Sequence, residues 1–145
     1  MKKIINAKYI VVHCSATKPD MYVDGEMIDR WHRERGFLKI GYHWVIRRDG
    51  TLDKGREIDE RGAHVRGFNS VSVGVCLVGG IDEEGKPDNN FTNEQFEALN
   101  EILAACKQTY PKAEILGHRD LPRVKKACPS FDVREGLKNL SRINI

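Results

Sequence analysis

Two histidines and one cysteine are the residues of this sequence whose types and placement best suit chemistry. His13 ends the β-branched run 9–13, which is typical of a buried strand, and His118 follows a second short strand predicted at 114–116. Strand ends in an α/β sheet converge on one rim, which is where ligand sites form. Cys128 follows His118 by ten residues, close enough to fold back onto that rim. The sequence therefore predicts two imidazoles and one thiolate at one edge of a sheet.

This set of side chains matches what a catalytic zinc site requires. Three protein ligands hold the ion and leave a fourth position for water, whereas four ligands close the site structurally. Bound Zn²⁺ lowers the pKa of its water from about 15.7 towards 7, so hydroxide becomes available at neutral pH. A lone histidine is more often a packed or exposed side chain than a ligand. On spacing and strand position alone, zinc ligation and ordinary packing both stay open.

The four cysteines fall into two groups. Cys14 and Cys76 lie in apolar strand-like runs and Cys106 on the apolar face of a helix, which predicts small buried thiols. Cys128 differs, because it lies in a polar, irregular stretch before Pro129. Without a secretory signal, free thiols or metal ligands are expected rather than disulfides.

The intervening segments predict both strands and helices. Strands are expected at 42–47, 51–52 and 71–78, and helices at 24–34, from 92 onward and at 133–140. Thr92 and Gln95 form a capping box at the start of the longest helix. Phe91 and Phe96 flank that start as a hydrophobic staple. The predicted fold class is α/β, a single domain over 1–145 with a central mixed β-sheet flanked by helices.

Length, charge and hydropathy exclude several classes of protein. A chain of 145 residues suits one compact domain, expected to be a monomer. A net charge of +3 without a basic arm argues against a nucleic-acid partner. No apolar run approaches the roughly 20 residues of a membrane span, which argues against membrane insertion. Polar residues interrupt the apolar segment near the N-terminus, so we expect a protein made in the cytoplasm that another protein must deliver to any substrate outside.

Five motifs resemble, in order, those of the N-acetylmuramoyl-L-alanine amidases of phage lysins. They are VHCSAT at 12–17, GYHWVIRRDG at 41–50, GAHVRGFN at 62–69, SVGVCLVGG at 72–80, and GHRD at 117–120 with KACPSFD at 126–132. The resemblance runs from about Tyr9 to Asp132 without large gaps, and is closest to the short, single-domain phage lysozymes that are amidases. The same fold serves the animal peptidoglycan recognition proteins.

The resemblance implies a zinc hydrolase that cleaves peptidoglycan between N-acetylmuramic acid and L-alanine. It assigns one Zn²⁺ to His13, His118 and Cys128, and recognition proteins that only bind peptidoglycan commonly carry serine in place of the cysteine. It also implies that Tyr42 hydrogen-bonds the attacking water or the intermediate. The Lys126 ammonium would stabilise the oxyanion.

Three further residues are expected at the substrate groove. The resemblance places His64 there, with Asn69 nearby, while Trp31 either stacks on the substrate or packs in the core. His43 alternates with Tyr42 along a predicted strand, so it should face away from the site and be structural. Asp132, the final residue of the last motif, is either a support for a ligand or a surface acid.

Two other functions share some of these features. A peptidoglycan-binding module would have the same fold without catalysis, but would not need Cys128, Tyr42 and Lys126 together. A structural zinc protein would need a fourth ligand, such as His64 or Cys14, and Cys14 should point to the opposite face of its strand from His13. The expected setting is phage or prophage lysis, bacterial wall turnover, or a delivered toxin.

Overall fold

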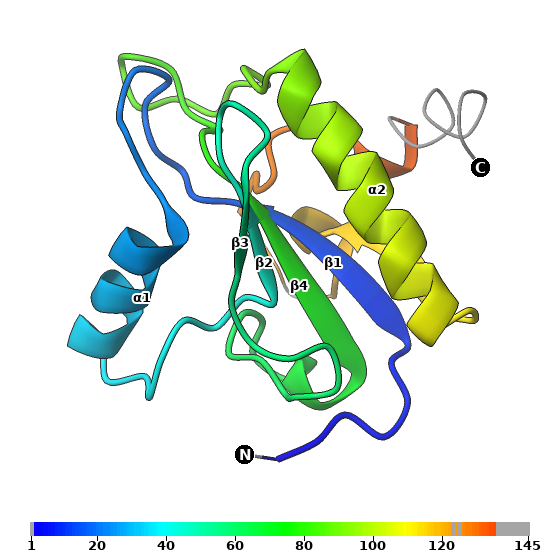
Figure 1. Cartoon of the computed structure of the whole chain (residues 1–145). Helices are drawn as coiled ribbons and strands as arrows, with labels where there is room; N and C mark the ends of the chain where they lie inside the picture. The colour runs from blue at the N-terminus through cyan, green and yellow to red at the C-terminus, as the bar shows by residue number, and fades with distance from the viewer. Residues whose placement is uncertain (1, 123, 125, 136–145) are drawn as a thin grey trace.

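A computed structural model describes residues 2–122, 124 and 126–135 of the chain. A five-stranded mixed sheet forms its centre, in the order β3-β2-β4-β1-β5. The strands are β1 (Tyr9–Cys14), β2 (Trp44–Ile46), β3 (Leu52–Lys54), β4 (Ser72–Leu77) and β5 (Glu114–Gly117). Only β3 runs antiparallel to its neighbour; β1, β2, β4 and β5 are parallel, so their carboxyl ends meet at one edge. The predicted α/β fold with a mixed sheet is confirmed (Figure 1).

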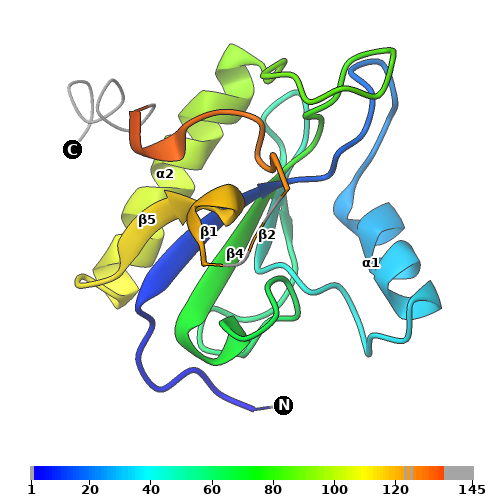
Figure 2. The ribbon, with the colours of Figure 1, turned by 180° about the vertical axis from the view of Figure 1, so that it is seen from behind.

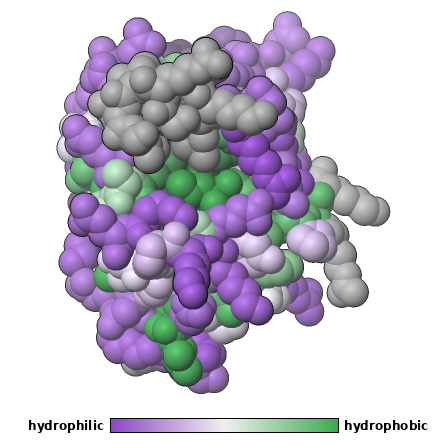
Figure 3. All heavy atoms as spheres, turned by 90° about the vertical axis from the view of Figure 1, so that its right-hand side faces the viewer, coloured by the Kyte–Doolittle hydropathy of each residue, from purple (hydrophilic) through white to green (hydrophobic). Residues whose placement is uncertain are grey.

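One face of the sheet packs against helix α2 (Asn93–Thr109). Ile10, Val12 and Cys14 of β1 belong to this core, since alternate residues of a strand point to the same face. The helix begins as predicted: Thr92 accepts from the Gln95 N–H in a complete capping box. The Phe91 and Phe96 rings of the staple have centroids 6.1 Å apart. Figure 3 shows the side of the molecule on which α2 lies, where hydrophilic side chains cover much of the surface around a band of hydrophobic atoms.

The opposite face is covered by two separate groups of residues. Helix α1 (Gly25–Glu34), capped by Asp24, lies over β2 and β4 with the cluster Val23, Ile28, Ile40, Val45, Cys76 and Val78. Loop residues lie over β1 and β5 with Val11, Val65, Leu116 and Leu121. Figure 2 shows the β5 edge, and α1 apart from it at the far end of the sheet. His13 shares this face with Val11, and its ring lies against Tyr42, which packs on the first group.

Two predicted elements differ from the structure. The strand expected at 42–47 begins only at Trp44. The Tyr42 carbonyl oxygen accepts from the Arg56 N–H, and the carbonyl oxygen of the very next residue, His43, accepts from the Gly55 N–H. An antiparallel ladder uses alternate residues, so regular pairing ends there. Of the helix expected at 133–140, residues 133–135 are helical and the others lie outside the described residues.

Two further observations bear on the sequence predictions. Asp132 is exposed and its Oδ1 accepts from the Glu135 N–H (3.2 Å), so it caps this helical turn rather than supporting a ligand. Within the described part of the chain, no helix combines the length and apolar character needed to cross a membrane.

Candidate metal centre and active site

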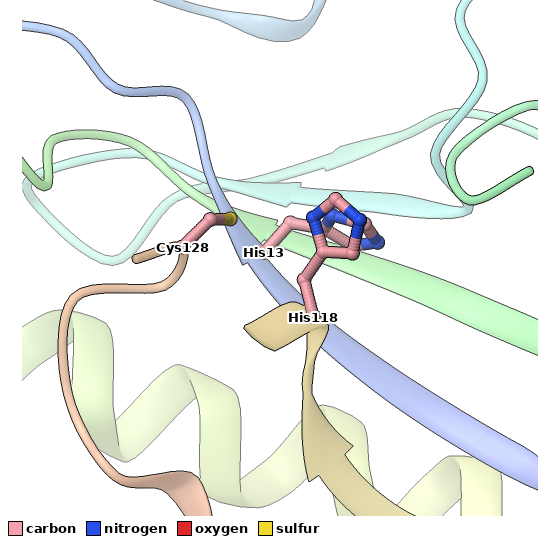
Figure 4. A group of neighbouring side chains, drawn as sticks. All are labelled: His13, His118 and Cys128. Atoms are coloured by element: carbon pink, nitrogen blue, oxygen red, sulfur yellow. The ribbon is translucent and has the colours of Figure 1, made fainter. Parts of the chain in front are cut away.

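The three predicted metal ligands lie together at the carboxyl edge of the sheet. His13 lies near the end of β1 and His118 follows β5 directly, and the parallel register pairs Val12 with Gly117. The ligand atoms of His13, His118 and Cys128 all lie within 4.8 Å of one another. Figure 4 shows the three side chains turned toward one another from three segments of the chain. Two imidazoles and one thiol at this spacing fit a zinc ion with a fourth position left open.

Hydrogen bonds from two neighbouring segments hold Cys128 in place. The Arg119 N–H donates to the Cys128 carbonyl oxygen (2.8 Å), which ties this loop to the turn that carries His118. The Cys14 N–H donates to Cys128 Sγ (3.0 Å). An N–H donor of this kind stabilises a thiolate, the form in which cysteine binds a metal. The peptide bond between Cys128 and Pro129 is cis.

Burial sets the protonation of the candidate ligands. It lowers the pKa of His13 well below its usual range, and the charges of neighbouring imidazoles add to this effect. Burial, followed by the positive charge of Lys126, also lowers the pKa of His118. Both rings are therefore neutral near pH 7, the form that binds metals. A hydrogen bond with the Cys14 thiol, together with burial, raises the pKa of Cys128, so a metal must displace the thiol proton.

Tyr42 and Lys126 both lie beside the candidate ligands. The centroid of the Tyr42 ring is 5.1 Å from that of His13. Burial raises the pKa of Tyr42 well above 10, and nearby thiols, first that of Cys76, add to the shift. The phenol therefore keeps its proton at neutral pH. Lys126 is exposed, and its charge lowers the pKa of His13 as well as that of His118.

His64 contacts a candidate ligand directly, which the sequence did not predict. His13 Nε2 and His64 Nδ1 lie 2.8 Å apart, with the two rings nearly perpendicular. His64 Nε2 lies 3.1 Å from Ser72 Oγ. Burial, followed by the charge of His43, lowers the pKa of His64 to about 3, so this ring is neutral. Since both ring nitrogens have partners within the protein, His64 can line a substrate groove only through its ring carbons.

The other two histidines have structural contacts. His43 Nδ1 accepts from the Gly74 N–H (3.0 Å), and His43 Nε2 donates to the Glu60 carbonyl oxygen (2.6 Å). His43 is therefore structural, as predicted, although it precedes β2 rather than lying within it. His32 Nδ1 accepts from the Gly41 N–H (2.9 Å) and so supports the segment that leads into Tyr42.

Trp31 and Asn69 both have contacts within the protein. Trp31 is half-buried against the cluster under α1. Asn69 Oδ1 accepts from the N–H groups of His64 (2.9 Å) and Val65 (3.0 Å), and Asn69 also lines a cavity of about 570 Å³. Contact with a substrate stays a prediction for both residues.

Two glycines leave the space that the His64 ring occupies. A Cβ on Gly74 would lie 2.6 Å from His64 Cγ, and one on Gly62 would lie 2.7 Å from His64 Cδ2. Glycine inside a strand often marks the close approach of another group. Gly74, between two valines of a buried strand, was therefore a signal in the sequence for a neighbour such as His64.

Replacing Gly74 with alanine is expected to destabilise the fold by about 1–3 kcal/mol, because the added methyl group overpacks the site against the His64 ring. Chemical denaturation measures this change. Gly67→Ala is the comparison, since Gly67 has open space around it but a φ of +87°. Its cost should be about 1 kcal/mol, from backbone strain alone. A Gly74→Ala protein no less stable than Gly67→Ala would contradict the crowding described above.

Solved structures similar to this one include amidases and peptidoglycan recognition proteins. The N-acetylmuramoyl-L-alanine amidase LysC from Clostridium intestinale URNW superposes with a TM-score of 0.82 at 25% identity, covering 99% of this chain and 92% of that one. Apis mellifera PGRP-SA superposes with a TM-score of 0.78, covering 96% of this chain and 86% of that one. Its identity of 19% makes this a likeness of fold. The class is therefore that of the peptidoglycan amidases and recognition proteins.

Sequence comparison identifies the family within that class. Residues 3–131 match the family model described as N-acetylmuramoyl-L-alanine amidase. An endolysin of Enterobacteria phage K11 is 55% identical over 127 residues, which cover 88% of this chain and 83% of that one. This chain belongs to the N-acetylmuramoyl-L-alanine amidase family, a family of enzymes, and the assignment made from its motifs is confirmed.

Proposed function

We propose that this protein is a zinc-dependent amidase of the endolysin type. It hydrolyses the bond between N-acetylmuramic acid and L-alanine in peptidoglycan. The observation that carries this proposal is the convergence of His13, His118 and Cys128 within 4.8 Å at the sheet edge. Endolysin relatives such as that of phage K11 support a role in wall lysis.

The donor set fits zinc better than the harder cations. Imidazole and thiolate are zinc ligands, whereas magnesium and calcium prefer oxygen donors. Among the described residues, the group consists of two histidines and one cysteine, which corresponds to an open rather than a closed site. When bound, zinc supplies a Lewis acid that polarises the amide carbonyl and acidifies water.

Tyr42 and Lys126, which both lie beside the ligand group, assist the reaction. Because burial keeps the Tyr42 phenol protonated, Tyr42 acts as a hydrogen-bond donor and holds a proton at Oη for the leaving amine. The Lys126 ammonium, whose field reaches both histidines, stabilises the negative charge that develops on the carbonyl oxygen. His64, Asn69 and Trp31 are assigned to the border of the groove, His64 through its ring carbons.

Product analysis of digested peptidoglycan tests this function. Purified peptidoglycan is incubated with zinc-loaded protein, with protein stripped by a chelator, and with stripped protein reloaded with zinc. Mass spectrometry should find stem peptides that begin at L-alanine, with intact sugar strands, in the first and third samples. Cleaved sugars in the digest would place the reaction at another bond. Tight retention without cleavage would indicate a binding module, the second reading of this fold.

Replacing Lys126 with methionine is expected to lower kcat by about 10²-fold, since it removes one source of charge stabilisation in the transition state. Zinc content should not change, because Lys126 is not a ligand. Lys112→Met is the matched control. Lys112 is exposed and precedes the amino end of β5, whereas the ligand group lies at the carboxyl ends of the strands. Initial rates of peptide release measure both variants, and equal rates would remove Lys126 from the mechanism.

A further inference from the structure

A chain of hydrogen bonds runs from a candidate ligand to a backbone carbonyl. His13 Nε2 lies 2.8 Å from His64 Nδ1, and His64 Nε2 lies 3.1 Å from Ser72 Oγ. Ser72 Oγ in turn lies 2.7 Å from the Phe68 carbonyl oxygen. His13 and Ser72 are buried, so bulk water does not compete for these contacts.

The last acceptor in this series of hydrogen bonds determines which atom is the donor in each bond before it. A carbonyl oxygen only accepts, so the Ser72 hydroxyl uses its one proton on Phe68. Ser72 Oγ must then accept from His64 Nε2–H. A neutral imidazole with a proton on Nε2 has its lone pair on Nδ1, which accepts from His13 Nε2–H. His13 is left with an unprotonated Nδ1.

We propose that His64 is a positioning residue that holds His13 in the Nε2–H tautomer, so that His13 Nδ1 presents its lone pair to the metal. Ser72 acts through His64, because its hydroxyl determines which His64 nitrogen carries the proton. The inference rests on the proposed zinc site and assigns His64 to the support of that site. Partners of this kind fix the tautomer and ring orientation of a ligating histidine.

The surroundings of His64 keep its ring in this orientation. Gly62 and Gly74 lie against the ring, where a Cβ on either would come within 2.7 Å of a ring atom. Asn69 Oδ1 accepts from the His64 backbone N–H, which holds the loop that carries the ring. Packing against the two glycines therefore fixes the ring, and the hydrogen bond to Asn69 fixes the backbone that carries it.

Two substitutions of His64 separate hydrogen bonding from bulk. His64→Asn retains an acceptor oxygen close to the position of Nδ1, whereas His64→Leu fills similar space without an acceptor. Competition with a chromophoric chelator should show zinc affinity about 10- to 100-fold weaker in His64→Leu. His64→Asn should recover most of this loss. Ser72→Ala, which removes the hydroxyl but retains the imidazole, should show a smaller loss and keeps the test open if His64→Leu does not fold.

Nitrogen NMR of the metal-free protein gives a readout independent of zinc. Long-range ¹H–¹⁵N correlation should show His13 as the Nε2–H tautomer in the wild-type chain, and as a mixture of tautomers in His64→Leu or Ser72→Ala. A wild-type His13 with its proton on Nδ1, or a folded His64→Leu protein with unchanged zinc affinity, would overturn the inference. If instead the wild-type chain bound no zinc but retained the His13 Nε2–H tautomer, the proposed zinc function would fail while the hydrogen-bond chain stood.

Discussion

Replacing Cys128 with alanine should abolish zinc binding and lower the rate of peptide release by more than about 10³-fold. The substitution removes the thiolate, which is the only negatively charged ligand in the set of three. Without the metal, the attacking water has a pKa of about 15.7 instead of about 7. Zinc content measured by mass spectrometry after gel filtration, together with the rate of release, tests both parts of this expectation.

Cys106→Ala provides the control for loss of a thiol. Cys106 lies on α2 and is buried against the sheet, and it is not one of the three candidate ligands. Its replacement should lower stability by about 1 kcal/mol and leave zinc content and rate unchanged. A Cys128→Ala protein that still retained one equivalent of zinc would show that other residues hold the metal.

Replacing Tyr42 with phenylalanine should lower kcat by about 10²- to 10³-fold while zinc content stays at one equivalent. The ring would still pack against the cluster under α1, so only the phenolic O–H is lost. Because burial keeps that O–H protonated, the variant lacks a proton donor rather than a base. Steady-state kinetics on soluble muropeptides separates an effect on kcat from one on KM.

Tyr110→Phe is the matched control for Tyr42→Phe. The Tyr110 hydroxyl donates to the Ile58 carbonyl oxygen (3.0 Å), so its removal costs about 1 kcal/mol of stability. Catalysis by this control should match the wild-type chain. Equal kcat values for Tyr42→Phe and the wild-type chain would leave proton donation to another group.

Local patterns predicted most of the scaffold that carries the site. The Thr92 capping box and the apolar run of β1 were predicted within a residue or so, because hydrogen bonds and side-chain alternation within a few residues decide them. The opposite orientations of His13 and Cys14 followed from the same alternation. The resemblance correctly placed Tyr42 beside the site. The strand expected around Tyr42 is shorter than predicted, because the hydrogen bond from the Arg56 N–H to the Tyr42 carbonyl oxygen could not be predicted from the local sequence.

Contacts between distant segments were predicted only in part. Strand ends and family motifs together brought His13, His118 and Cys128 to one place. The contact between His13 and His64 joins residues 51 positions apart and depends on the register of neighbouring strands. Periodicity carries no information about such a pair, and Gly74 was the one local sign of it.

The way Cys128 is held also determines when the ligand group can form during synthesis. Its sulfur accepts from the backbone of Cys14, 114 positions earlier in the chain. The ribosome makes the segment with Cys14 long before it makes the segment with Cys128. In the nascent chain, β1 is therefore present before Cys128 can bind to it. Parallel pairing of distant strands is also slow to form. The ligand group can therefore close only late in folding, and a growing chain that has not yet reached Cys128 should be without amidase activity.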